Sequence, residues 1–331
     1  MQFFDNGQIL QVAMGKRIAT VPNAVSLFSG CGGSDLGLER AGFVTLIAND
    51  VLPYAKLVYQ ANMPDTEFLL GNVADIRHFP PAELLAGCYP CQGFSQGGVR
   101  DPARNINYLY REFDRALRAI RPKAFIVENV SGMVRTNYSH LLTNQVTRFR
   151  SAGYRVKWAV LNAKDYGVAQ NRKRIFIVGI RSNLGVEFEF PEPTHGEGRP
   201  NPIVTQKDVI ADLPDWPKGE FDEHDFHWYY LSRDRRSEWD EPSKTIVSNY
   251  RHVPLHPSSP KLIKFGHNDW RFATTRPARR LSYREAARLQ GFHPKFQFPD
   301  ASLVKKFEVI GNAVPPPLFF AVANALPNVW D

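Results

Sequence analysis

The chain has 331 residues, of which 43% are hydrophobic and 12% aromatic, so it can bury one large core and the core of a smaller lobe. Its 41 Lys and Arg residues exceed its 33 Asp and Glu residues, and the net charge of +8 is compatible with an anionic partner such as nucleic acid. Three cysteines cannot form a disulfide framework, and neither a membrane-spanning apolar run nor a signal peptide is recognisable, which predicts a soluble intracellular protein.

The first third of the chain alternates short apolar runs with helical patterns, as a doubly wound α/β sheet does. A buried strand is predicted at "AVSLF" (24–28), followed by a glycine-rich turn (glycines 30, 32 and 33) and a helix. A second strand at "FVTLIAND" (43–50) ends in Asp50. Such a turn with an acid after the next strand suits a nucleotide-type ligand, although tight strand–helix turns also need glycine for steric reasons.

Further along, the sequence predicts a helix at 107–120 and strands at 123–130 and 174–180. Residues 83–87 form a further possible strand, which would lead towards Cys91. The whole pattern therefore favours one large sheet with helices on its faces.

The carboxyl ends of these strands are the expected ligand site, because open α/β sheets bind their ligands there. Glu128 stands near the end of its strand and is expected at the same edge as Gly30 and Asp50. Cys91 joins them if the run before it is a strand.

The stretch "AGCYPCQGFSQGG" (86–98) holds Cys88 and Cys91 in a C-x-x-C frame, which allows a zinc site, a redox dithiol or a single reactive thiol. A zinc site would lack its remaining ligands, because Cys31 lies inside the glycine turn and the H-x-x-H stretch at 224–227 is too short for the usual spacing. A dithiol normally begins a helix, whereas a flexible stretch follows here. Two buried, inert thiols are the default for isolated cysteines.

The composition and patterning of the sequence change at about residue 191. The stretch 191–275 holds 10 of the 25 prolines and four of the six tryptophans, without a sustained helical or strand period, so a loop-rich small domain is expected. Regular patterning returns at "LSYREAARLQGF" (281–292), predicted as a helix with Ser282 as N-cap and Glu285 as its capping-box partner.

Six ordered blocks resemble those of the DNA (cytosine-5)-methyltransferase family, of the prokaryotic restriction–modification type. They are "SLFSGCGG" (26–33), "YPCQGFS" (89–95), "ENVSGM" (128–133), "NAKDYGVAQNRKRIF" (162–176), "RRLSYREAARLQGF" (279–292) and "VIGNAVPPPL" (309–318). The resemblance runs nearly end to end.

The resemblance implies the fold of S-adenosylmethionine-dependent methyltransferases, a doubly wound mixed sheet with a smaller, loop-rich DNA-recognition domain. Residues 1–190 plus 305–331 would form the catalytic, cofactor-binding domain. Residues 191–304 would form the target-recognition domain, with a variable region at about 191–275.

The resemblance assigns Cys91 as the thiolate that adds to C6 of a cytosine, so that C5 can accept a methyl group from S-adenosyl-L-methionine. Glu128 would protonate N3, and Arg174 would hold O2, with Gln170 and Arg172 supporting the site. The cytosine must be flipped out of double-stranded DNA for this reaction. Ser95 would contact the DNA backbone beside it.

The same resemblance implies a cofactor site and no metal. Phe28, Gly30 and Gly32 would line the methionine end, Asp50 would bond the ribose, and Asn72, Asn312 and Val314 would complete the pocket. Two residues depart from the family pattern. Asn72 stands where an aspartate is common, and Cys88 replaces a usual glycine and is expected to be a packed bystander.

Arginine is the side chain best shaped to reach O6 and N7 of guanine together. Residues 229–257 loosely resemble the recognition region of members that modify G·C-rich palindromes such as GGCC, which makes Arg233, Arg235 and Arg251 candidate readers. Arg236 is expected to hold a phosphate.

Two other functions share this architecture. A tRNA cytosine-5 methyltransferase would carry a Cys-Phe-Thr stretch that is missing here, and a catalytically inactive DNA-binding relative would be expected to lose Cys91 or Glu128. The resemblance also implies a cytoplasmic, monomeric prokaryotic enzyme without membrane partners, which could work beside a cognate restriction endonuclease.

Overall fold

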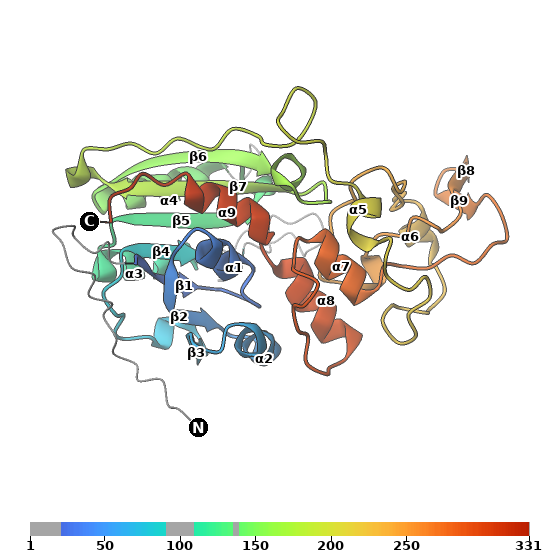
Figure 1. The fold of residues 1–331 in the computed structure, drawn as a ribbon, viewed down its shortest axis with the longest axis horizontal. Helices are drawn as coiled ribbons and strands as arrows, with labels where there is room; N and C mark the ends of the chain where they lie inside the picture. Colours follow the sequence, from blue (N-terminus) through green and yellow to red (C-terminus); the bar gives the residue numbers. More distant parts are fainter. Residues whose placement is uncertain (1–20, 91–108, 135–138, 331) are drawn as a thin grey trace, which may run out of the picture.

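The computed structural model describes residues 21–90, 109–134 and 139–330 (Figure 1). Its centre is a seven-stranded sheet in the order β3-β2-β1-β4-β5-β7-β6. Strands β1 to β5 are mutually parallel, and β7 runs antiparallel to both of its neighbours, so the expected doubly wound mixed sheet is confirmed. The strands are β1 (Asn23–Leu27), β2 (Val44–Asp50), β3 (Glu67–Leu70), β4 (Leu84–Gly87), β5 (Ala124–Val130), β6 (Tyr154–Asn162) and β7 (Lys173–Arg181).

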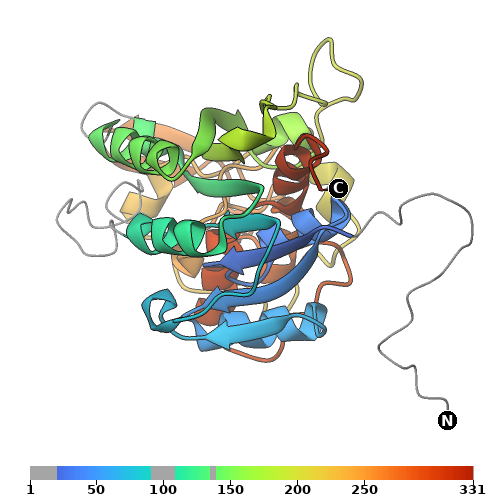
Figure 2. The same cartoon turned by 90° about the vertical axis from the view of Figure 1, so that its left-hand side faces the viewer.

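Helices cover both faces of the sheet (Figures 1 and 2). One core lies between the sheet and helices α3 (Tyr110–Ile120) and α4 (Ser139–Ser151), and the other lies beneath α1 (Gly33–Arg40) and α9 (Pro316–Asn324). The central strands are apolar on both sides: Phe125 of β5 belongs to the first core and Ile126 to the second. Helix α2 (Pro53–Asn62) packs beside β2 and β3.

The turn between β1 and α1 needs glycine for two separate reasons. Gly30 and Gly32 have positive φ angles of 55° and 91°, a region that side chains rarely adopt. A Cβ atom on Gly33 would lie 2.2 Å from the backbone oxygen of Val314, so the C-terminal segment can approach this turn only because the side chain is absent.

A second lobe lies to one side of the sheet (Figure 1). It holds α5 (Gln206–Ile210), α6 (Trp228–Leu231) and the antiparallel hairpin of β8 (Leu262–Gly266) and β9 (Asp269–Phe272). Helices α7 (Tyr283–Leu289) and α8 (Leu303–Asn312) lie between this lobe and the sheet. Short 3₁₀ helices occur at Val73–Asp75, Ser131–Val134, Ala163–Tyr166, Ser182–Leu184 and Tyr250–His252.

The predicted strands match β1, β2, β4, β5 and β7, and the described part of the predicted helix 107–120 is α3. The capping box of α7 is confirmed, because the Ser282 side chain accepts from the Glu285 backbone N–H while Glu285 accepts from Ser282. The two short helices and the hairpin within 191–275 were not predicted. The domain boundaries at 190 and 305 stay a prediction. No helix among the described residues is long and apolar enough to cross a membrane.

Candidate active site and recognition surface

The glycine turn and Asp50 meet at the carboxyl ends of β1 and β2. The Gly30 backbone N–H donates to Oδ2 of Asp50 at 2.9 Å, and the Leu52 N–H donates to Oδ1 at 2.9 Å. Burial raises the pKa of the Asp50 carboxyl, and these two N–H donors oppose that shift. A Cβ atom at Gly30 would meet no atom of the described residues within 4 Å, which leaves this turn open to the approach of a ligand.

Two more predicted cofactor residues border the same edge. The Phe28 ring packs edge-on against Tyr89 with the ring centroids 5.9 Å apart. Asn72 follows β3 and is exposed, and its side-chain oxygen accepts from the Ala74 N–H at 3.0 Å. The Asn72 side chain therefore also caps the short helix that it precedes, which the sequence did not indicate.

The last predicted block reaches this edge through close backbone packing. Val314 is buried, and its backbone oxygen lies against Gly33 at the start of α1. Asn312 is exposed at the end of α8. Segments that are far apart in the sequence therefore border one site.

The acid predicted to protonate cytosine lies in β5 at the same edge. Glu128 is 7% exposed, and its Oε1 atom lies 2.9 Å from Nε of Arg174 in β7. The two side chains are diagonal neighbours, since Glu128 pairs with Phe176 and Arg174 pairs with Val130 across the strands. Burial raises the pKa of Glu128, and Arg174 and Arg172 oppose that shift, so the carboxyl is biased towards holding a proton.

Cys91 and Ser95 lie outside the described residues, but the chain leading to Cys91 is described. The Tyr89 hydroxyl donates to Oε1 of Gln145 at 2.5 Å, and the Asn129 amide donates to the Tyr89 backbone oxygen at 3.0 Å. Tyr89 is buried at the end of the run that continues β4. The backbone just before Cys91 is therefore anchored to both α4 and β5.

The two other cysteines lie in settings that disfavour a thiolate. Cys88 is partly buried, and burial together with the nearby Glu128 charge raises the pKa of its thiol well above the usual value. Cys31 is fully buried and donates to the Val309 backbone oxygen at 3.4 Å, and burial raises its pKa too. Both environments agree with packed, unreactive thiols.

A family model for C-5 cytosine-specific DNA methylases matches residues 23–328. The chain belongs to this family. Its relatives include the Type II methyltransferase M.BsuRI of Bacillus subtilis, 37% identical over 92% of this chain and 79% of the relative. The Type II methyltransferase M.NgoPII of Neisseria gonorrhoeae is 37% identical over 93% of this chain and 96% of the relative.

Solved structures share the fold of this methylase. A prophage-encoded DNA modification methyltransferase of E. coli superposes with a TM-score of 0.70 at 22% identity, covering 92% of this chain and 98% of that one. The Dnmt2 methyltransferase of S. pombe gives a TM-score of 0.63 at 15% identity, covering 92% and 96%. The activity of the family, methylation of cytosine at C5 in DNA, is the activity of this chain, and the family and fold imply use of S-adenosylmethionine.

Arg172 of the methylase joins three chain segments. Its guanidinium is 1% exposed and donates to the backbone oxygens of Ile246 at 2.9 Å, Gly311 at 2.9 Å and Ala313 at 3.0 Å. The Gly311 and Ala313 carbonyls flank Asn312 in the sequence. The Ile246 carbonyl lies in the segment that leads to Arg251. Arg172 therefore supports backbone on both the predicted cofactor side and the predicted DNA side.

Gln170 reinforces the same junction. Its side-chain oxygen accepts from the Ile246 N–H at 2.9 Å, and its amide donates to Gln290 at 2.6 Å. Gln290 in turn donates to the Ala313 backbone oxygen at 2.5 Å. Gln170 and Arg172 thus lie in one buried network, and their supporting role in the site stays a prediction.

The predicted guanine readers differ in exposure. Arg233 and Arg251 are exposed and each contacts a tyrosine hydroxyl at 3.0 Å, whereas Arg235 is partly buried and donates to the His252 backbone oxygen at 2.8 Å. Arg236 is different again. It donates to both carboxylate oxygens of Glu238 and to two backbone oxygens, so its guanidinium already has internal partners, and its phosphate role stays a prediction.

Sequence reasoning missed Gln145 and Gln290, whose side chains anchor Tyr89 and Ala313. It also missed the fully buried ion pair of Arg279 with Glu285 of α7, at 2.7 Å. None of these contacts has a local signal, because each depends on tertiary packing. The only available hint was that the capping-box position 285 carries an acid.

Proposed function

We propose that this methylase transfers a methyl group from S-adenosylmethionine to C5 of a flipped-out cytosine within a short, specific sequence of double-stranded DNA, through a covalent bond from Cys91 to C6. One observation carries the proposal for the site. The buried Glu128 carboxyl, paired with Arg174, lies in β5 beside β4, and β4 continues through the anchored Tyr89 to Cys91.

The first half of the reaction uses three side chains. The Cys91 thiolate forms a bond to C6, and the electron pair of the C5–C6 double bond is delocalised over C5, C4 and N3. Glu128 gives its proton to N3, so the ring does not keep the negative charge. Arg174 would hold O2 while remaining beside the carboxylate that this transfer creates, because its guanidinium already lies 2.9 Å from Glu128.

The second half restores the ring. Once C5 carries the methyl group, loss of the C5 proton to a base re-forms the C5–C6 double bond, and the bond from C6 to sulfur breaks with its electron pair returning to the Cys91 thiolate. The proton on N3 returns to the Glu128 carboxylate. Because C5 and C6 are stacked inside a duplex, the cytosine must leave the helix first. Ser95 would contact the backbone beside the extruded nucleotide.

The residues at the ends of β1, β2 and β3 suit the methyl donor. Gly30 leaves open space against the backbone, and Asp50 and Asn72 offer oxygen acceptors at the ends of neighbouring strands. Phe28, Gly32, Asn312 and Val314 would complete this pocket. S-adenosylmethionine, when bound there, supplies the methyl group that C5 receives.

The second lobe would select the DNA sequence. Arg233 and Arg251 are exposed and Arg235 lies close to them through His252, so we propose that they read guanines of a short G·C-rich palindrome such as GGCC. We further propose a cytoplasmic, monomeric enzyme of a prokaryote that protects DNA against a cognate restriction endonuclease.

The proposal is tested by incubating the protein with S-adenosylmethionine carrying a labelled methyl group and either duplex DNA or tRNA. Label is expected in DNA alone, and bisulfite sequencing should place it at one cytosine of a short motif containing guanine. Label in tRNA alone would favour the tRNA methyltransferase, and label in neither would favour an inactive relative.

A further inference from the structure

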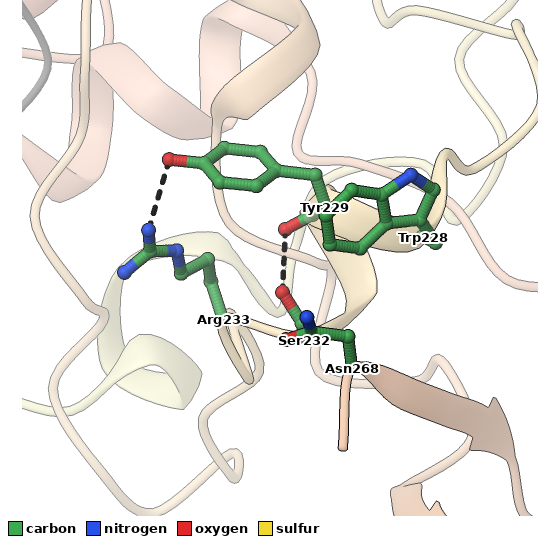
Figure 3. A pocket seen from close by; sticks show the side chains of 5 residues that line it. All are labelled: Trp228, Tyr229, Ser232, Arg233 and Asn268. Atoms are coloured by element: carbon green, nitrogen blue, oxygen red, sulfur yellow. Dashed lines mark hydrogen bonds between the residues drawn. The ribbon is translucent and has the colours of Figure 1, made fainter. Parts of the chain in front are cut away.

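A pocket of about 380 Å³ opens in the second lobe, between α6 and the turn of the β8–β9 hairpin (Figure 3). It is lined by Trp228, Tyr229, Ser232, Arg233 and Asn268. The hairpin lies at the end of this lobe that is farthest from the sheet, and α6 lies between the hairpin and α5 (Figure 1). The pocket is therefore separate from the active-site edge.

The walls of the pocket are aromatic and basic. Trp228 and Tyr229 are 52% and 40% exposed, and their rings stand edge to face with an interplanar angle of 88°. The Arg233 guanidinium lies 4.8 Å from the centre of the Tyr229 ring and donates to its hydroxyl at 3.0 Å, so Tyr229 fixes its position. Among the residues that the structure describes, no carboxylate lines the pocket.

Asn268 closes the pocket from the hairpin side. It lies in the two-residue turn between Gly266 and Asp269, with a positive φ of 63° that asparagine tolerates well. Its carboxamide makes no hydrogen bond to any residue that the structure describes, and it offers both a donor and an acceptor. The hairpin's one acidic residue, Asp269, is paired with Arg271 at 2.8 Å, so no unpaired hairpin carboxylate opposes an anion nearby.

These groups match a nucleotide better than a peptide or a lipid. Arginine binds phosphate or guanine, aromatic rings pack against sugars and bases, and asparagine can bond N6 and N7 of adenine together. The pocket shares Arg233 with the proposed guanine readers, and its other lining residues belong to or follow α6 and the turn of the β8–β9 hairpin. Its occupant would then be the base pair beyond the recognised sequence.

Resting on the proposed function, we propose that this pocket binds a nucleotide flanking the recognised sequence of duplex DNA. Asn268 reads the edge of its base, with adenine as the best fit, and Trp228 packs against its sugar. The enzyme accordingly methylates sites that share the same recognised sequence at rates that depend on the neighbouring base pair.

The test is a duplex library in which the recognised sequence is constant and the flanking base pairs are randomised, methylated for limited times and read by bisulfite sequencing. The wild type should prefer one base at one flanking position by about fivefold or more, the lower end of what a bidentate base contact contributes. Asn268→Gly removes the carboxamide and suits the positive φ, so it should flatten that preference without altering the recognised sequence. His267→Ala, in the same turn but not lining the pocket, is the matched control and should keep the wild-type profile.

Three results would overturn the inference while leaving the proposed function intact. They are a wild-type profile that is uniform at the flanks, an Asn268→Gly profile equal to that of the wild type, and a change in the recognised sequence itself. Absence of any DNA methylation by the wild type would instead refute the proposed function, and the inference with it.

Discussion

Replacing Arg172 by methionine should destabilise the protein strongly, because it keeps an unbranched apolar stem but removes the guanidinium with every one of its donors. Hydrogen bonds to charged groups contribute about 1.5–3 kcal/mol each, so the three bonds to Ile246, Gly311 and Ala313 correspond to roughly 4.5–9 kcal/mol. Part of this loss in the free energy of unfolding is offset, because the variant no longer has to bury a cation. We expect a net loss of about 3 kcal/mol or more, a large share of the roughly 5–15 kcal/mol typical of a folded domain.

Urea unfolding followed by tryptophan fluorescence measures this loss. Arg271→Met is the matched control, since the Arg271 guanidinium is ion-paired with Asp269 but is exposed in the hairpin, and this variant should unfold like the wild type. At urea concentrations where Arg172→Met stays folded, the dissociation constants for S-adenosylmethionine and for DNA should both rise. An Arg172→Met variant as stable as Arg271→Met would refute the view that Arg172 joins these segments.

Four further outcomes are expected. Cys91→Ser should abolish methyl transfer, while Cys88→Ala should keep most of it. Equal inactivity of both variants would instead favour the interpretation of Cys88 and Cys91 as a dithiol. Glu128→Gln should lower the single-turnover rate by about 10²–10⁴-fold. Because the pKa of Glu128 is raised, its protonated form persists to higher pH than that of an ordinary carboxyl, and the wild-type rate should fall as the pH rises through that pKa. A fall in rate over the same pH range in the Glu128→Gln variant would contradict this role. Asp50→Ala should raise the S-adenosylmethionine dissociation constant in calorimetry, and an unchanged constant would remove Asp50 from the pocket. Arg251→Ala should relax the preference at one base pair by about 1–3 kcal/mol in genome-wide mapping, and a uniform loss at all sites would identify a phosphate contact instead.

Five of the seven strands of the sheet and one helix boundary could be predicted because their signals are local, whereas β3 and β6 were not predicted. Apolar runs mark β1, β2 and β5, and the Ser282–Glu285 box marks the start of α7 with two reciprocal hydrogen bonds. The four-residue helix α6 and the short hairpin could not be predicted in this way. Such short elements are stabilised by packing, for example of Phe226 against Phe272, rather than by their own periodicity.

The candidate site was predicted as a set of residues, but not as a set of contacts. The sequence placed Gly30 and Asp50 at one edge, yet it could not show that the Asp50 carboxylate already accepts two backbone N–H groups. The role of Asn72 as a helix cap and the internal use of Arg236 are also invisible without coordinates. Side-chain partners depend on the tertiary fold, and the nearest carbonyl to Arg172 at the C-terminal end lies 139 residues away.

Because Glu128 and Arg174 pair diagonally across β5 and β7, insertions or deletions in these strands should harm the site more than those in the connections. Side chains alternate between the faces of a sheet, so shifting β5 against β7 by one residue would place the acid and the arginine on opposite faces. A single-residue insertion or deletion in either strand should therefore separate the pair even if the sheet re-forms. Length variation among natural variants of this chain is then expected to avoid 124–130 and 174–180 and to collect in connections such as 182–200, where no strand register depends on the count.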